Sequence, residues 1–184
     1  MAFDSFIKFI AAAGGTSESF KGESLDSEFS GTEGWFSIKE FSFGIENTLN
    51  ISTASGGAGA GKADFKEFTV KKQTDRASPY LAMTCGKGGH YAEVDLQLRK
   101  SGSAKVQGKA GQTYLSYKFK LVAVKSIEWS GSSGDDVPEE TVVFEYGAMQ
   151  MTYYPQLADG TMGNMVQRTW NKLSNSTSFT VPGL

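Results

Sequence analysis

Residues 114–129 read YLSYKFKLVAVKSIEW, and this run decides the fold class that we expect for the chain. Apolar side chains fall mostly on its odd-numbered positions and polar ones on its even-numbered positions, as in a β-strand with one buried face. Val122 and Val124 break the polar face. This pattern is typical of strands that are buried on both sides, or by their own core on one side and a partner on the other. The run is also long for one strand, which predicts contacts with another subunit.

Alternation of the same kind covers much of the remaining chain. Residues 92–99 alternate between apolar and polar, residues 35–45 place Phe41, Phe43 and Ile45 opposite Glu40, Ser42 and Gly44, and residues 141–154 place Val142, Phe144 and Tyr146 opposite Val143, Met149 and Met151. Strands therefore dominate the expected structure.

The segment after residue 77 departs from this pattern. Ser78 is a residue type that caps helix N-termini, Pro79 is preset for a first helical turn, and Gly86 favours a stop. These signals predict one short α-helix at about residues 79–85. Stretches rich in Gly, Ser or Ala at 11–19, 52–61 and 130–136 are predicted to be loops.

The expected architecture follows from these elements. The chain is predicted to be mainly β, a closed or nearly closed β-barrel of two antiparallel sheets with one short α-helix and extended loops. Its length of 184 residues is enough for one sizeable core. We therefore expect a single domain over residues 1–184.

Charge balance and cysteine content exclude several classes of function. The chain has 18 Lys and Arg against 20 Asp and Glu and lacks the basic stripe that nucleic acids or anionic membranes attract. The single cysteine, Cys85, has no intrachain disulfide partner and is expected to be a small, half-buried thiol. Asp4 and Lys8 stand where a leader peptide is apolar, and no apolar run reaches the roughly 20 residues that span a bilayer. If the protein leaves the cell, we therefore expect export without a cleaved signal peptide.

Residues 56–62, GGAGAGK, match most of a phosphate-binding P-loop. Ala63 follows where a Mg²⁺-binding hydroxyl is needed, and residues 64–72 have the pattern of a strand where a helix is required. A surface loop is the favoured interpretation, with a nucleotide-handling enzyme as the alternative.

Other candidate residues favour structural interpretations. His90, the sole histidine, is expected in the loop after the helix. Asp135, Asp136, Glu139 and Glu140 form a solvated acidic turn more readily than a Ca²⁺ site, because their spacing is not that of an EF-hand loop. The aromatic residues fill a core more readily than they line a ligand pocket. We predict no catalytic residue, no cofactor and no metal ligand.

Short motifs follow one another in a recognisable order. They are residues 1–8, Gly22-Glu23-Ser24, residues 41–44, residues 55–62 with Phe65 and Phe68, Lys71, Asp75, Ala77-Ser78-Pro79 with Leu81, Leu98-Arg99-Lys100 with Gly102, residues 130–136, Pro138-Glu139-Glu140, Tyr154-Pro155-Gln156, Ala158-Asp159-Gly160 and Trp170. In this order they resemble the Hcp family of bacterial type VI secretion tube proteins.

The resemblance implies a secreted structural protein and not an enzyme. It implies a β-barrel that forms hexameric rings, rings that stack into a tube, and small effectors carried in the lumen, with the type VI spike, sheath and baseplate as partners. It also implies assembly in the bacterial cytoplasm and export to the extracellular space or a target cell.

The resemblance also assigns residues. It makes Ser42 the candidate lumen-facing, effector-binding residue, and Ser55, Gly56, Gly57, Gly59 and Gly61 the candidate ring-stacking loop. An ordinary solvent-facing serine is the alternative for Ser42, and a monomeric β-barrel that carries an apolar ligand is the alternative for the whole chain.

Overall fold

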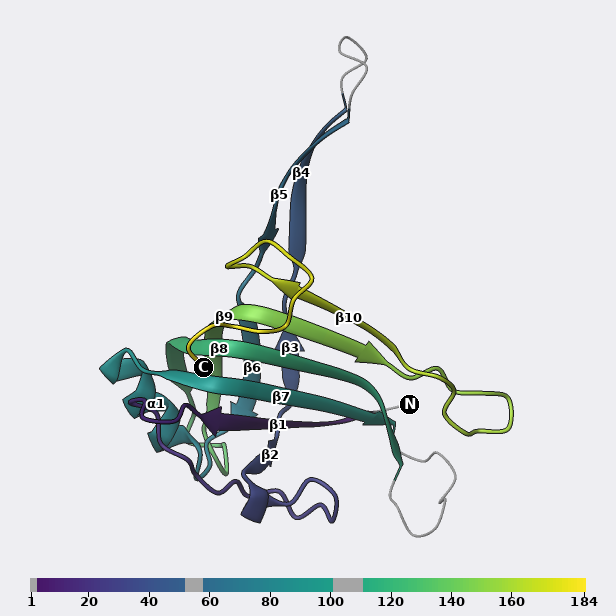
Figure 1. Cartoon of the computed structure of the whole chain (residues 1–184). Coiled ribbons are helices and arrows are strands. Elements are labelled where there is room, and N and C mark those ends of the chain that lie inside the picture. Colours follow the sequence, from purple (N-terminus) through teal and green to yellow (C-terminus); the bar gives the residue numbers. More distant parts are fainter. Residues whose placement is uncertain (1–2, 52–57, 101–110) are drawn as a thin grey trace.

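The computed structural model describes residues 3–51, 58–100 and 111–184 (Figure 1). Its helices are the 3-10 turn η1 (Gly31–Glu33) and the α-helix α1 (Ser78–Lys87). Its strands are β1 (Phe3–Ala11), β2 (Trp35–Ser37), β3 (Glu40–Ser42), β4 (Ile45–Ile51), β5 (Ala58–Phe65), β6 (Phe68–Gln73), β7 (His90–Lys100), β8 (Gln112–Ser130), β9 (Glu139–Tyr153) and β10 (Val166–Asn171).

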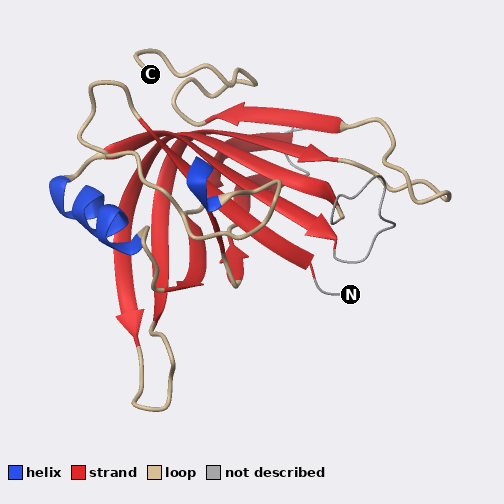
Figure 2. Cartoon of the chain, turned by 90° about the horizontal axis from the view of Figure 1, so that it is seen from below, coloured by secondary structure: helices blue, strands red, loops and turns tan. Residues whose placement is uncertain are grey.

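One antiparallel sheet dominates the fold. Its eight strands run in the order β2-β1-β7-β8-β9-β6-β3, with β10 paired to β9. Because β6 pairs with the first half of β9 and β10 with its second half, the sheet divides into two parts along this strand. The sheet curls around its core, α1 lies at one side, and the separate two-stranded sheet β4-β5 projects as a hairpin (Figures 1 and 2). The prediction of a mainly β, barrel-like fold with one α-helix is confirmed.

The two longest strands change face where the sheet bends. In β8 the buried hydrophobic residues are Tyr117 and Phe119, then Val122 and Val124, so the core-facing side passes from odd to even positions. Leu121, between them, has φ 52, a left-handed conformation that non-glycine residues rarely adopt. The two valines therefore belong to the same core as the odd-numbered residues, and the change of face explains them without burial of both sides of the strand. The predicted contact with another subunit stays a prediction.

β9 makes the same change opposite β8. Phe144 and Tyr146 are buried, and beyond Gly147 the buried core residue is Met149. Both strands thus bend together, which lets one continuous sheet enclose the core from two sides.

The curled sheet nearly closes where the chain passes from β2 to β3, the two ends of the strand order. The Ile38 amide donates to the Ser5 carbonyl on β1, and the next amide, Lys39, donates to the Lys71 carbonyl on β6 at 2.8 Å. These two residues connect opposite edges of the sheet. Residues 35–45 therefore form two short strands, β2 and β3, and reach the first residue of β4, so they are not one alternating strand. Ile45 is half exposed.

Aromatic rings fill the interior. Phe68, Phe119 and Phe144 contact one another with ring centroids 4.7 to 5.6 Å apart. All three are fully buried, and burial of one such side chain contributes about 1.5–3 kcal/mol. A second, small cluster of Phe6, Phe29 and Trp35 lies under the loop that follows β1.

The helix is longer than predicted at both ends. Ala77 is the N-cap and makes no side-chain cap, whereas Ser78 is the first helical residue. The left-handed residue that ends the helix is Gly88, with φ 64, and not Gly86. The sequence therefore located the helix correctly. However, the Ser78 side chain does not cap its N-terminus, and the left-handed turn expected at Gly86 lies at Gly88. Within the described ranges, no helix has the length and apolar character to cross a membrane.

Two other boundaries differ from the predictions. The predicted loop at 52–61 overlaps β5, which already begins at Ala58, and the predicted strand at 64–72 is interrupted between Phe65 and Phe68. His90 opens β7 and pairs with Ala123, so it is a strand residue and not a loop residue.

Candidate assembly and binding surfaces

Ser42 lies at the end of β3, paired with Thr69 of β6. Its flanking residues, Phe41 and Phe43, pack inward: both rings stack on Phe68, with centroids 5.8 and 5.2 Å away. Since successive side chains of a strand alternate between faces, Ser42 points outward, and it is exposed.

The outward face around Ser42 is polar and charged. Lys71 Nζ lies 2.9 Å from a Glu40 carboxylate oxygen across β3 and β6, and Lys39 pairs with Glu139 beside them. The hydrogen bond to the Glu40 carboxylate raises the pKa of Lys71 above its ordinary value. Both ion pairs are half exposed, so solvent screens them and each contributes little to stability. This face can offer hydroxyls and charges to a polar partner.

The β4-β5 hairpin is the second candidate surface. Its strands project away from the curled sheet (Figure 1). Lys66 pairs at its base with Asp64 at 2.6 Å and Glu46 at 3.0 Å, and the hydrogen bond from Lys66 lowers the pKa of Asp64. Gly59 and Gly61 are residues of β5, while Ser55, Gly56 and Gly57 lie outside the described residues. A strand thus follows the glycine-rich stretch, where a P-loop requires a helix.

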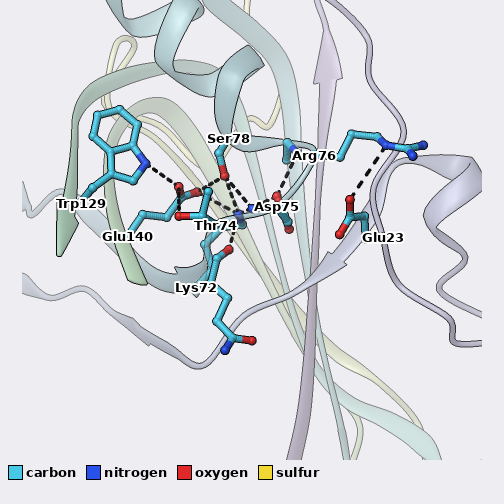
Figure 3. Close-up of polar contacts among 10 residues, drawn as sticks. Glu23, Lys72, Thr74, Asp75, Arg76, Ser78, Trp129 and Glu140 are labelled. Atoms are coloured by element: carbon cyan, nitrogen blue, oxygen red, sulfur yellow. Dashed lines mark hydrogen bonds and ion pairs between the residues drawn. The ribbon is translucent and has the colours of Figure 1, made fainter. Parts of the chain in front are cut away.

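A buried ion-pair network joins β6, α1, β8 and β9 (Figure 3). Lys72 and Glu140 have fully buried side chains and lie 2.8 Å apart, and Lys72 also donates to Asp75 at 2.7 Å. The Ser78 hydroxyl and the Trp129 indole N–H donate to the two Glu140 oxygens. Both oxygens of the Glu140 carboxylate therefore accept hydrogen bonds from donors within the protein.

This network corrects the prediction of a solvated acidic turn. Glu140 is buried, and only the preceding residues of the turn face solvent. Asp135 caps the turn by accepting from the Ser132 amide and hydroxyl, which lowers the pKa of Asp135. Across the described part of the chain, no cluster of His, Cys, Asp and Glu has a geometry that could hold a metal ion.

Arg99 is a second buried charge that sequence patterns did not reveal. Its guanidinium binds Asp26 in a bidentate manner, at 2.6 and 3.1 Å, and lies over the Phe6 ring. Asp26 also accepts the amides of Glu28 and Phe29, so one carboxylate shapes the loop after β1 and ties it to β7. The hydrogen bonds from Arg99 lower the pKa of Asp26 to about 2.

The remaining candidates have structural surroundings. Cys85 is half-buried, as predicted, with its Sγ 3.6 Å from the Lys125 carbonyl oxygen. Trp170 stacks on Phe65, and Trp35 belongs to the small cluster under the loop. Because aromatic rings occupy the interior, the arrangement favours core packing over a pocket for an apolar ligand.

Comparisons with known proteins agree with the fold described above. The family model described as "Type VI secretion system effector, Hcp" matches residues 9–153. This chain belongs to the Hcp family. The match spans the strands from β1 to β9, including both the Ser42 strand and the β4-β5 hairpin.

Individual relatives support the family assignment and the fold. Protein hcp1 of Pseudomonas aeruginosa strain PAO1 is 34% identical over 115 residues, which cover 62% of this chain and 68% of the relative. A solved structure of a type six secretion system protein is similar with a TM-score of 0.80 and 28% identity, covering 95% of this chain and 99% of the other. Hcp1 from Salmonella typhimurium shares the fold, with a TM-score of 0.71 at 23% identity over 95% of this chain and 98% of its own.

Hcp membership confirms the resemblance seen in the sequence and places the chain in a family of structural proteins secreted by the type VI system. The family match ends with β9. The roles of Ser42 and of the loop at 55–61 stay predictions.

Proposed function

We propose that this chain is the repeating unit of a secretion tube, in which hexameric rings stack end to end and carry small effectors in the lumen. The observation that carries the proposal is the β4-β5 hairpin, which projects from the sheet in a protein of the Hcp family (Figure 1). A two-stranded hairpin is marginally stable by itself in water and gains stability by packing on another surface. A neighbouring ring supplies that surface, through Gly59 and Gly61 of β5 and the adjoining residues Ser55, Gly56 and Gly57.

Ser42 then faces the lumen. The exposed hydroxyl lies on a polar face with Thr69, Glu40 and Lys71, and this surface suits a folded polar cargo held by many weak contacts. The spike, sheath and baseplate of the secretion apparatus are the proposed partners of the assembled tube. Assembly in the cytoplasm precedes export.

Imaging and mass measurement of the purified chain test the proposal. Light scattering is expected to give six times the 19.8 kDa chain mass, and negative-stain electron microscopy is expected to show rings. A monomer at high concentration with no rings would overturn it. If that monomer retains a lipid detectable by mass spectrometry, the apolar carrier is the correct function.

The proposed role is structural and non-catalytic. Calorimetric titration with ATP and Mg²⁺ is expected to give no binding heat, because the glycine-rich stretch continues into β5. Saturable heat that disappears in a Lys62→Ala variant would revive the nucleotide-handling alternative.

A further inference from the structure

The β4-β5 hairpin shares no hydrogen-bonded ladder with the main sheet in the described part of the chain. Its two strands form a separate sheet, which begins where Ile45 pairs with Phe65. The chain enters the hairpin after Gly44 and leaves it at Lys66, whose amide donates to the Gly44 carbonyl at 2.9 Å. Hydrogen bonds to a neighbouring strand fix the direction of a strand within a sheet. Since the main sheet makes none to this hairpin, contacts at its base must set the direction in which it projects.

Side chains from the C-terminal part of the chain hold that base. The Trp170 ring of β10 stacks on the Phe65 ring, with centroids 6.0 Å apart and planes inclined by 14°. Lys172, just after β10, donates from Nζ to the Phe65 carbonyl oxygen at 3.4 Å, and its Nζ lies 4.7 Å from the centroid of the Tyr146 ring. The Tyr146 hydroxyl donates to the Lys66 carbonyl at 3.3 Å. The end of β5 is thus tied to β9 and to the end of β10.

Asn171 organises the turn that places these two side chains. It is only 1% exposed. Its Oδ1 accepts the amides of Leu173 and Ser174, and its Nδ2 donates to the Thr180 carbonyl at 2.9 Å. One buried amide therefore closes the turn after β10 and anchors residues 173–184, which we call the tail.

The tail runs back over the sheet from β10 (Figure 1). The Phe179 ring lies 4.8 Å from Lys120 Nζ on β8, and Val181 is buried. The backbone of Lys172 is fixed as well, because its amide donates to the Gly147 carbonyl at 2.8 Å. The tail and the corner of β9 together place Lys172 at the base of the hairpin.

We propose that residues 170–172 set the direction in which the β4-β5 hairpin projects. Trp170 and Lys172 are positioning residues that act on the end of β5, and Asn171 couples their placement to the tail. The tail is then a conformational control, because its displacement opens the turn after β10 and withdraws both contacts from the hairpin. A small rotation at the base moves the far ends of the strands most. Only the consequence for ring stacking rests on the proposed function.

Pulsed electron paramagnetic resonance measures the direction of the hairpin. Spin labels are attached at Asn47→Cys on β4 and Glu128→Cys on β8, which are both exposed positions, in a Cys85→Ala background. Dilution with unlabelled chain removes distances between copies. Without further changes, the labelled chain is expected to give one narrow distance distribution.

Three variants and one control test the assignment. Lys172→Met removes the ammonium donor and Trp170→Leu removes the ring stack, and each is expected to broaden the distribution at least twofold. Asn171→Asp keeps the Oδ1 acceptor, loses the Nδ2 donor that anchors the tail, and is expected to have the same effect. Lys100→Met is the matched control, because Lys100 Nζ also lies over an aromatic ring, that of Tyr114 at 5.4 Å, but toward the start of β10 and not its end. Circular dichroism and thermal melting confirm that each variant is folded.

The possible outcomes separate this inference from the proposed function. Distributions that stay narrow in Lys172→Met and Trp170→Leu would overturn the positioning role, and a narrow one in Asn171→Asp would overturn the control by the tail. Electron microscopy of Lys172→Met is expected to show rings, with a more than tenfold rise in the concentration needed for tubes. Tubes at the original concentration would overturn the consequence for stacking. A chain that forms no rings would overturn the proposed function, while the distance distributions would still decide the positioning role.

Discussion

Leu121 and Gly147 lie opposite each other at the corner where β8 and β9 change face. Leu121 has φ 52, and a Cβ atom built on Gly147 lies 3.3 Å from the Leu121 Cβ and 3.1 Å from Leu173 Cδ1. The flanking pairs are Lys120 with Ala148 and Val122 with Tyr146, so the two residues occupy the same point of the ladder. The bend therefore depends on the left-handed backbone of Leu121 and on the close approach of the Gly147 backbone to the Leu121 side chain.

Gly147→Ala is expected to destabilise the protein by about 1–3 kcal/mol, because the added methyl group overpacks the corner against Leu121. Leu121→Gly in the same chain is expected to recover part of the loss, since it removes the Cβ contact and the cost of the left-handed conformation. Urea unfolding of the single and double variants measures the coupling. Gly134→Ala, where nothing lies within 4 Å of the new Cβ, is the control. Equal effects at both glycines would contradict the overpacking.

Lys72→Met is expected to cost about 3–5 kcal/mol, because Glu140 then stays buried without its cation. Adding Glu140→Leu removes the uncompensated charge and is expected to restore much of the stability. Lys71→Met, which breaks the half-exposed pair with Glu40, is expected to change the free energy of unfolding much less than Lys72→Met does. Chemical denaturation of the variants compares them. Losses of similar size at Lys71 and Lys72 would show that burial does not control the strength of the network.

Acid is expected to weaken the Arg99–Asp26 contact within a defined window. The pKa of Asp26 falls from 3.8 to about 2 on folding, so its carboxylate stabilises the native state above the unfolded value and loses this effect as the pH falls to about 2. The contribution at neutral pH is about 2 kcal/mol. Asp26→Asn should therefore lower stability at pH 7 and have little effect near pH 2. A difference that is constant between pH 7 and pH 2 would contradict this assignment.

Ser42→Gln is expected to change cargo capture and not the fold. The side chain is exposed, so its replacement should alter the free energy of unfolding by less than about 0.5 kcal/mol and leave ring formation intact. Co-purification of small secreted proteins with the rings is expected to fall. Ser37→Gln, at an exposed serine of β2, is the matched control and should leave capture unchanged. Unaltered capture in Ser42→Gln would assign this residue to an ordinary solvent-facing position.

Local patterns in the sequence determined the strands, the helix and the family. Alternation on residues 92–99 reports directly on β7, and the short motifs around Pro79 place α1, because side-chain periodicity and capping act between residues close in the chain. The alternation of β8 and β9 was also visible, but its interruption at Val122 had two readings. Only the bend at Leu121 and Gly147 showed that one core covers both halves of each strand.

Tertiary structure alone decided the buried charges and the open surfaces. Lys72 and Glu140 are 68 residues apart, and Arg99 and Asp26 are 73 apart, so no local pattern distinguishes them from solvated charges. The exposure of Met151 and Val166 likewise depends on where the core ends, and not on the composition of their strands. Burial is a property of the whole packed chain, whereas alternation is a property of a few neighbouring residues.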